Sequence, residues 1–253
     1  MNLRKINIEQ KAKDFRNTNA LTPSEPIRLK SLLLQLNVLS VFKSLENSSS
    51  ISGMALKIKE ENSVKRFIFI NSKHTLGRQH FTICHELYHL FIQENFSHQI
   101  CNTGVFDRKD AEEYNADYFA SFFLLPEEGI LKMIPQKEKE KENKITLSSI
   151  LKIEQYFSSS RSALLNRLKD IGLINKEYAE QFKTNISREA NLHGYQTTLY
   201  KSGNENLIIG DYGDKAKRLF DNEKISESHF ASLMIDIGID ISDGENINYE
   251  NLT

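Results

Sequence analysis

The chain has 253 residues, and its 33 lysines and arginines nearly balance 34 aspartates and glutamates, which leaves a net charge of −1. This length is sufficient for one large or two modest domains with a hydrophobic core. The charge balance excludes a strong overall attraction to nucleic acid or to an anionic membrane. There are two cysteines, Cys84 and Cys101, and no apolar run resembles a signal peptide or a membrane span. We therefore expect a cytoplasmic protein that does not associate with a membrane.

The N-terminal part of the chain has helical and then β-rich patterns. Apolar residues at helical spacing predict one helix over 7–15 and another that starts near Pro26 and runs to Leu36. Three β-rich segments follow, separated by polar turns: 38–45, 52–58 and 65–70. These segments predict a small, mainly antiparallel sheet and an α+β fold.

A His-Glu-x-x-His motif follows the β-rich segments, at His85, Glu86 and His89. Its flanks are apolar and contain no Gly or Pro between 81 and 92, which predicts a buried helix packed on the sheet. Residues four apart share a helix face, so the two imidazoles can bind one metal ion. Glu86 can then reach a metal-bound water without binding the metal itself. On these five residues alone, histidines that merely decorate an amphipathic helix are an open alternative.

A second helix, predicted over 110–125 and ended by Pro126, can supply the missing ligand. Glu113 would complete a set of two histidines and one carboxylate, which is common at catalytic zinc sites. Asp117, one turn further along the same face, is expected to accept a hydrogen bond from the outer ring nitrogen of a ligating histidine. Its neighbour Glu112 is expected to be a solvated surface charge.

These motifs together resemble the ImmA/IrrE family of gluzincin-like zinc metallopeptidases. The resemblance rests on His85-Glu86-x-x-His89, on Glu113-x-x-Ala116-Asp117-x-Phe119-Ala120, and on Leu124-Leu125-Pro126. It extends over 20–175 and is strongest over 77–126, although the family more often has Asn where this chain has Asp117. The resemblance implies a Zn²⁺-dependent endopeptidase. It also implies a protein substrate, a helix-turn-helix transcriptional repressor whose cleavage derepresses stress-response or mobile-element genes.

In such a reaction Glu86 is the catalytic residue, as general base and then general acid. The substrate is expected to add as an extended strand at a sheet edge, for which 67–71 is the candidate, although a buried central strand would have the same pattern. The side chains expected to be able to donate to the oxyanion are Arg78, Tyr118 and His98, and the alternatives are His74, His80, Tyr88 and Tyr114.

Two other functions remain open from the sequence. The first is a DNA- or protein-binding regulator, similar to an antitoxin or repressor, with a non-catalytic zinc site. A structural zinc usually has four protein ligands, and no fourth ligand is clearly spaced for this, although His98 or Cys101 could fold back. The second is a toxin-like hydrolase that uses the same chemistry on another bond.

The remainder of the chain is predicted to form two further units. A charged run over 136–144 is a linker or a solvated helix face, and helices over 146–156 and 161–173 form a helix-turn-helix-like pair. Residues 146–183 hold six basic and four acidic side chains, and this excess of positive charge is small for a segment that binds DNA phosphates. We therefore expect these helices to pack on the peptidase core, and direct DNA binding is the less favoured alternative. The predicted domains are 1–135, a zinc metallopeptidase domain; 136–183, the linker and helical segment; and 184–253, a C-terminal regulatory or docking domain.

The C-terminal domain is predicted to be small, α+β and acidic. It contains six basic and twelve acidic residues, and such a surface would suit a basic partner such as a DNA-binding repressor. Segments 195–200 and 206–209 predict a β-hairpin. Two helices, over 215–220 and 226–237, are predicted to follow, with Gly238 as the stop.

Overall fold

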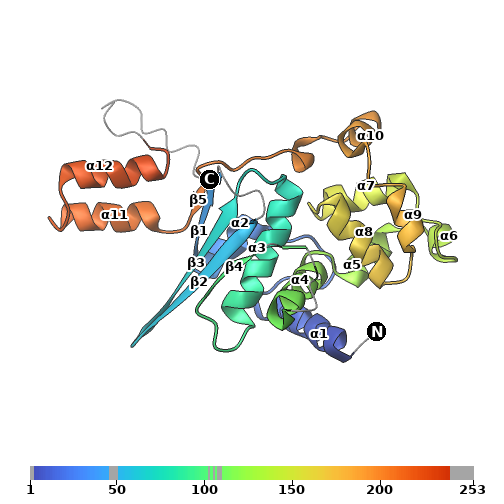
Figure 1. The fold of residues 1–253 in the computed structure, drawn as a ribbon, viewed down its shortest axis with the longest axis horizontal. Helices are drawn as coiled ribbons and strands as arrows, with labels where there is room; N and C mark the ends of the chain where they lie inside the picture. The colour runs from blue at the N-terminus through green and yellow to red at the C-terminus, as the bar shows by residue number, and fades with distance from the viewer. Residues whose placement is uncertain (1–2, 46–50, 102, 105, 107–109, 240–253) are drawn as a thin grey trace.

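The computed structural model describes residues 3–45, 51–101, 103–104, 106 and 110–239. A five-stranded mixed sheet lies at the centre, with the order β4-β2-β3-β1-β5, and helices surround it (Figure 1). The predicted α+β class is therefore confirmed. The strands are β1 (Val38–Lys43), β2 (Gly53–Glu60), β3 (Ser63–Asn71), β4 (His98–Cys101) and β5 (Ile208–Ile209).

The sheet is mainly antiparallel, as predicted. Strands β2 and β3, β2 and β4, and β1 and β5 pair antiparallel, while β1 and β3 pair parallel. The prediction that 67–71 forms the substrate-binding edge is wrong, because β3 is paired on both sides. Among the described strands the edges are β4 and β5, which are only four and two residues long.

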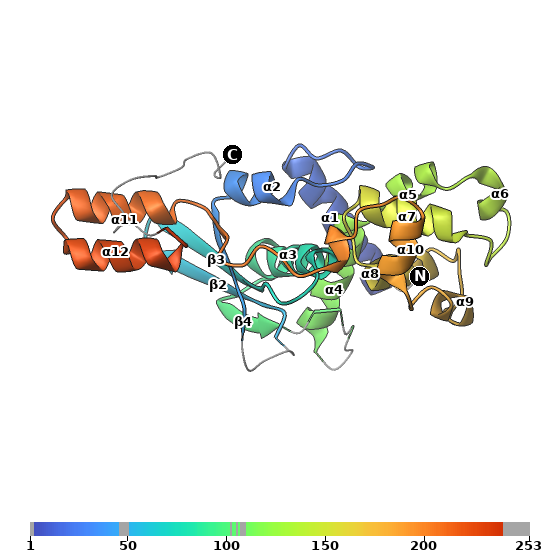
Figure 2. The same ribbon diagram turned by 90° about the horizontal axis from the view of Figure 1, so that it is seen from above.

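The helix that carries the His-Glu-x-x-His motif, α3 (Leu76–Phe91), packs on β2 and β3. Most of its residues are buried, as its apolar flanks predict. Helix α4 (Ala111–Leu124) packs against α3, and α1 (Leu3–Thr18) packs against α4, while α2 (Leu29–Gln35) lies along β1 (Figure 2). The second predicted helix thus begins at Leu29, three residues after Pro26.

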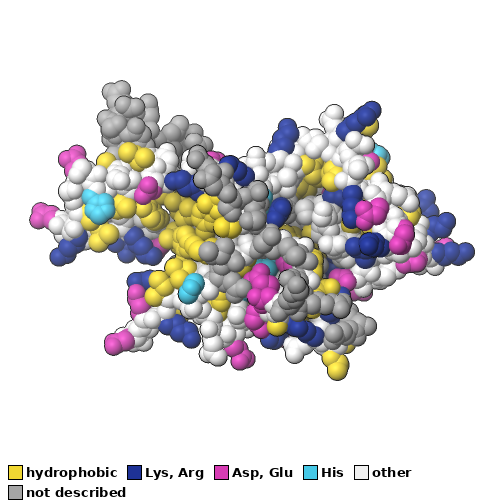
Figure 3. Space-filling model, in the orientation of Figure 1, with side chains coloured by type: hydrophobic (Ala, Val, Ile, Leu, Met, Phe, Trp, Pro, Cys, Tyr) yellow, Lys and Arg dark blue, Asp and Glu magenta, His cyan; other side chains and the backbone are white. Residues whose placement is uncertain are grey.

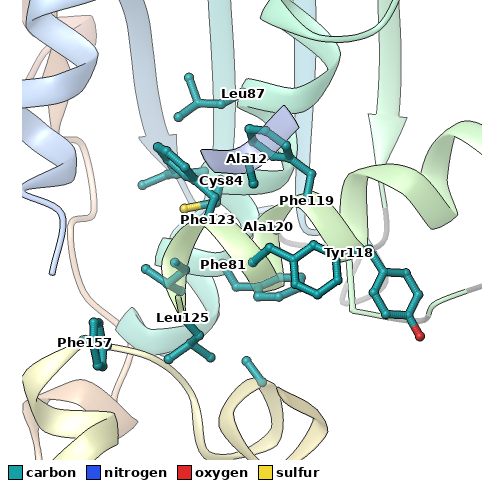
Figure 4. Packing of buried hydrophobic residues seen from close by; sticks show 14 of the residues in the cluster. Ala12, Phe81, Cys84, Leu87, Tyr118, Phe119, Ala120, Phe123, Leu125 and Phe157 are labelled. Carbon is teal, nitrogen blue, oxygen red and sulfur yellow. The ribbon is translucent and has the colours of Figure 1, made fainter. Parts of the chain in front are cut away.

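Local sequence explains where α4 begins and how it is held. The carboxylate of Asp110 accepts hydrogen bonds from the backbone N–H groups of Glu112 and Glu113, which is an N-cap. On the buried face the rings of Phe119 and Phe123 stack with centroids 5.4 Å apart. Figure 4 shows these rings in the core formed with α3 and the helices that follow. Glu113 is therefore fixed in the first turn of a helix that is rigidly packed on the motif helix.

A helical segment follows the sheet and α4. Its helices are α5 (Glu127–Met133), α6 (Gln136–Lys139), α7 (Leu147–Tyr156), α8 (Arg161–Asp170), α9 (Lys176–Glu180) and α10 (Ile186–Leu192). The predicted pair is confirmed by α7 and α8, which contact each other. However, Arg161 and Arg167 of this segment are buried and paired with acidic side chains. Those two cations are not available to phosphates.

The C-terminal part differs from the prediction in one respect. The β-hairpin over 195–209 is wrong, because Thr198–Tyr200 form the short helix η1 and β5 pairs with β1 of the central sheet. The two helices are confirmed as α11 (Tyr212–Asp221) and α12 (Glu227–Asp236), with Gly238 in a left-handed conformation after them. The acidic residues after 239 lie outside the described residues. The boundary at 184 stays a prediction.

The surface agrees with the balanced charge of the sequence. On the face seen in Figure 3, basic and acidic side chains are interspersed, and hydrophobic side chains gather between the sheet and the pair α11–α12. Within the described ranges, none of the helices has the length and apolar content that crossing a membrane requires.

Candidate metal centre

His85 and His89 lie one turn apart on α3, and both are fully buried. Their Nε2 atoms are 3.1 Å apart. Glu113 of α4 reaches across, with Oε2 3.3 Å from His85 Nε2 and Oε1 3.2 Å from His89 Nε2. The structure therefore brings together the three side chains for which the sequence predicts a common metal ion, although Glu113 is 24 residues further along the chain.

These residues fit a zinc ion. Zinc bonds to nitrogen and oxygen of about 2.0–2.1 Å place tetrahedral donor atoms about 3.3–3.4 Å apart. The separations between the two Nε2 atoms and the Glu113 oxygens are close to those values, so an ion needs only small shifts to bind all three. Within the described part of the chain, the residues whose ligand atoms all lie within 4.8 Å of one another are His85, His89, Cys101 and Glu113.

The outer nitrogens of both imidazoles are held by acceptors. His85 Nδ1 lies 2.9 Å from Asp117 Oδ1, the contact that the proposed role of Asp117 requires. Asp117 also accepts hydrogen bonds from the backbone N–H groups of Gly104 and Phe106, at 2.8 and 2.7 Å. His89 Nδ1 lies 2.5 Å from Gln93 Oε1. With Nδ1 as the donor, both rings present Nε2 to a metal.

Gln93 is absent from the sequence prediction. The spacing of Gln93 could have indicated its role, because Gln93 follows His89 by four residues and so lies one turn beyond His89 at the end of α3. A polar residue at this spacing is common on helices, which is why the pattern alone does not single it out.

The charges of the cluster are coupled in the absence of a metal. Burial favours the neutral form of His85, but hydrogen bonds to Asp117 and Glu113 outweigh it and raise its pKa to about 10. Burial likewise opposes ionisation of Glu113, but its contacts with His85 and His89 lower its pKa far below the usual range. These shifts favour a protonated His85 beside an ionised Glu113, and a metal ion that binds to His85 must displace that proton.

Glu86 lies beside this cluster and is fully buried. Burial raises its pKa to about 7, although the neighbouring histidines lower it. Among the described residues its Oε1 atom has no hydrogen-bond partner, which is costly for a buried carboxylate and indicates that a ligand or solvent belongs there. A Cβ atom at Gly53 would lie 2.8 Å from this oxygen, so only glycine lets β2 come so close.

Cys101, at the end of β4, is the fourth member of the cluster. It pairs with Gly53 across the sheet, which places its thiol over the buried Glu86. Its Sγ atom lies 3.4 Å from Glu113 Oε1 and 3.6 Å from Glu86 Oε2. Burial and these two carboxylates raise the pKa of the thiol far above its usual range. The sequence analysis named Cys101 only as a residue that could fold back, because β4 is too short to predict.

The expected oxyanion donors lie at different distances from the cluster. Arg78, on α3, donates a hydrogen bond of 2.9 Å to Ser52 Oγ beside the start of β2. Tyr118 packs its ring against Phe106, and its hydroxyl points away from the core in Figure 4. His98 is exposed and, three residues before Cys101 on β4, faces the other side of the sheet.

Two of the alternative donors are already engaged elsewhere. The hydroxyl of Tyr88 donates to Glu112 Oε2 at 2.7 Å, and Glu112 is half-buried and not a member of the metal cluster. The Nδ1 atom of His80 lies 2.7 Å from the backbone oxygen of Ser158. Of the expected donors, Arg78 is the one whose side chain bonds to the chain at the start of β2, next to Gly53.

The fold and this site define a metallopeptidase domain of the His-Glu-x-x-His type. The family model of the IrrE N-terminal-like domain, peptidase family M78, matches residues 43–169, which is half of the chain. The chain therefore belongs to this family, and the resemblance inferred from its motifs is confirmed. No curated protein matches the chain.

Proposed function

We propose that the protein is a cytoplasmic, zinc-dependent endopeptidase that cleaves a protein substrate, a helix-turn-helix transcriptional repressor, and so derepresses stress-response or mobile-element genes. The observation that carries the proposal is the placement of Glu86. A fully buried carboxylate with an unpartnered oxygen lies beside a donor set that fits zinc, in a domain of a peptidase family. This combination suits proton transfer to and from a reacting group.

His85, His89 and Glu113 would hold the ion, and Asp117 and Gln93 would fix the orientation of the two rings. Bound zinc supplies Lewis acidity, which polarises a carbonyl and lowers the pKa of water to about 7. Without a metal ion, burial raises the pKa of Glu86 to about 7, and this burial favours return of a proton that the carboxylate has accepted. Glu86 would take the proton from the attacking water and deliver it to the leaving amine.

Strand β4 is the sheet edge on the side of the metal cluster, since Cys101 belongs to both. On its other side β4 pairs with β2. A substrate segment that adds to the free edge as an extended strand would pass beside Glu113 and Glu86. This geometry favours an unfolded or loop segment of a protein as the substrate, because a folded helix cannot pair with an edge.

The choice of a repressor as partner follows from the family resemblance and from charge. The tail from 184 onwards has twice as many acidic as basic residues, which would favour association with a basic DNA-binding protein. Direct DNA contact by α7 and α8 is the weaker alternative because Arg161 and Arg167 are buried.

Co-expression with the product of the neighbouring gene tests this proposal. We expect mass spectrometry to find a cut in that protein that disappears on chelation and in a Glu113→Ala variant. Glu112→Ala is the matched control, because Glu112 is the adjacent residue of α4 and accepts only from Tyr88 in the described contacts. Cleavage that survives the loss of Glu113, with the metal content unchanged, would rule out our ligand set.

A further inference from the structure

Cys101 lies where a fourth ligand of the metal would be. A catalytic zinc site has three protein ligands and keeps its fourth position for solvent. A zinc–sulfur bond of about 2.3 Å and a zinc–oxygen bond of about 2.0 Å place the two donor atoms about 3.5 Å apart. The separation between Cys101 Sγ and Glu113 Oε1 is 3.4 Å. The sulfur therefore lies at a ligand separation from the Glu113 oxygen, and the ligand atoms of His85 and His89 are within 4.8 Å of Cys101 as well.

Three further observations place this thiol in the site. Its strand partner Gly53 has no side chain, and a Cβ atom there would lie 2.7 Å from Thr82 Cγ2 and 2.8 Å from Glu86 Oε1 of the motif helix. The side chain is buried, with an exposed fraction of 1%. The adjacent Glu86 Oε1 is buried without a hydrogen-bond partner among the described residues, which points independently to a missing ion or ligand at the same place.

The other cysteine provides a contrast within the same protein. Cys84 directly precedes His85 in the sequence, yet its side chain lies in the hydrophobic core with Leu87 and Phe123 (Figure 4). It belongs to no group of potential metal ligands within the described part of the chain. Cys84 is therefore adjacent to the motif in sequence but outside the metal cluster, whereas Cys101 is further away in sequence and belongs to the cluster.

We propose that Cys101 binds the zinc ion as a fourth protein ligand and closes the site in the resting protein, so that the peptidase is latent until substrate docking on β4 withdraws the sulfur. This inference rests on the proposed function, because the zinc site closed by Cys101 is taken as the resting state of the proposed peptidase. Thiolate is a preferred ligand of zinc. As the sulfur–metal bond forms, the S–H bond breaks, and the proton passes to Glu86, whose Oε2 is 3.6 Å away.

The position of Cys101 on an edge strand gives the closure a way to open. β4 has four residues and pairs with β2 on one side. Short edge strands with few contacts open locally at low cost. A substrate that pairs with the free edge contacts the same strand that carries the thiolate, so docking and withdrawal of Cys101 would be coupled. On withdrawal the proton returns from Glu86 to sulfur, and the Glu86 carboxylate is again available as a base.

X-ray absorption spectroscopy of the zinc-loaded, full-length protein tests the ligand. We expect a sulfur shell at about 2.3 Å beside the nitrogen and oxygen shell. Cys101→Ala should lose the sulfur shell and still bind one zinc through the three remaining ligands, while the matched control Cys84→Ala should keep it. A zinc-loaded wild type without sulfur scattering, or a sulfur shell that persists in Cys101→Ala, overturns the proposal.

The closure itself is tested with acetohydroxamate as a probe of the open metal position, by titration of the cobalt-substituted protein. If the open form is about 1–10% populated, closure weakens the apparent affinity of the probe about 100- to 10-fold. We therefore expect Cys101→Ala to bind the probe at least about tenfold more tightly than wild type and Cys84→Ala. Equal affinities in all three proteins overturn the closure even if sulfur is a ligand.

These two measurements do not depend on a protein substrate. A sulfur shell and tighter probe binding by Cys101→Ala, combined with no cleavage of any repressor by either protein, would support the fourth ligand and contradict the proposed peptidase substrate. Faster cleavage by Cys101→Ala than by wild type is the expected result when both proposals hold.

Discussion

Two clusters of buried charge in this protein differ in whether they are complete. The metal cluster of His85, His89, Cys101 and Glu113 forms one group of ionisable side chains together with the adjacent, buried Glu86. The arginine cluster, between α7 and α8, consists of Glu154, Arg161, Glu189 and Tyr200. In the arginine cluster Glu154 accepts two hydrogen bonds from Arg161, at 2.6 and 2.8 Å, and one from Tyr200 at 2.5 Å. In the metal cluster an oxygen of Glu86 has no partner among the described residues.

The difference separates a structural role from a chemical one. Arg161 supplies the positive charge that Glu154 needs, so the arginine cluster is satisfied within the protein. The metal cluster has two carboxylates and a thiol facing two imidazoles, and an added cation would take the place of the proton on His85 and interact with all of these donors. Burial alone therefore does not identify a site, whereas an unpartnered buried carboxylate beside a set of metal ligands does so here.

The largest expected effect is the loss of turnover in Glu86→Gln. The amide keeps the shape of the side chain but cannot take a proton, and general base catalysis contributes about 10²- to 10⁴-fold. We expect a rate reduction in that range with the zinc content unchanged, measured by cleavage of the substrate and by elemental analysis. Full activity of the zinc-loaded variant would remove the role that we assign to Glu86.

The next largest effect is expected on stability, in Arg161→Ala. Removal of one partner from a buried ion pair leaves the other charge uncompensated and costs about 3–5 kcal/mol. We expect this loss in the free energy of unfolding, from denaturant titration, with one zinc still bound to the folded protein. The double variant Arg161→Met/Glu154→Leu is the control, because apolar replacement of both charges should restore most of the loss. A single variant as stable as wild type would contradict a closed structural cluster.

The sequence predicts α3 and α4 of the metal cluster and α7 and α8 of the arginine cluster well, for reasons that are local. In α3 and α4 the apolar positions recur at helical spacing over at least three turns, and caps such as Asp110 fix where they begin. The edges of the sheet are different. β4 and β5 have four and two residues, too few to show a period, and a strand such as β3 has the same apolar pattern at an edge or in the centre.

The same reasoning explains which parts of the sites are predictable. His85, Glu86 and His89 are linked by helical geometry, and the family resemblance brings Glu113 and Asp117 to them. Cys101 and Gly53 come together only through the pairing of β2 with β4, which depends on the fold as a whole. Arg161 and Glu154 are isolated charges on amphipathic helices, where solvent exposure is the usual outcome.

A smaller effect is expected on metal affinity in Asp117→Asn. Asp117 Oδ1 accepts from His85 Nδ1 and from Gly104 N–H, and Oδ2 accepts from Phe106 N–H. An amide oxygen can keep the two bonds of Oδ1 without the charge, but the amide NH2 group cannot accept the bond from Phe106. Loss of such a supporting partner typically costs about 10- to 100-fold in metal affinity. We expect the zinc affinity of the variant, measured by competition with a chelator, to fall by no more than this factor. The catalytic rate of the zinc-saturated variant should change less than the affinity. A large loss of rate at full zinc occupancy would show that the charge takes part in the reaction.

The smallest effect is expected at Lys217 of α11, whose ammonium group lies 2.7 Å from Asp221. The shortest distance between Arg161 and Glu154 is 2.6 Å, so the two pairs are similar in this distance and differ in burial and in the number of hydrogen bonds. Lys217 is mostly exposed, and exposed pairs four residues apart on a helix contribute about 0.3–0.5 kcal/mol. We expect Lys217→Ala to change the free energy of unfolding by no more than this, and less at high salt. A loss comparable to that of Arg161→Ala would mean that contact distance, rather than the desolvation of the charges, decides what an ion pair contributes in this protein.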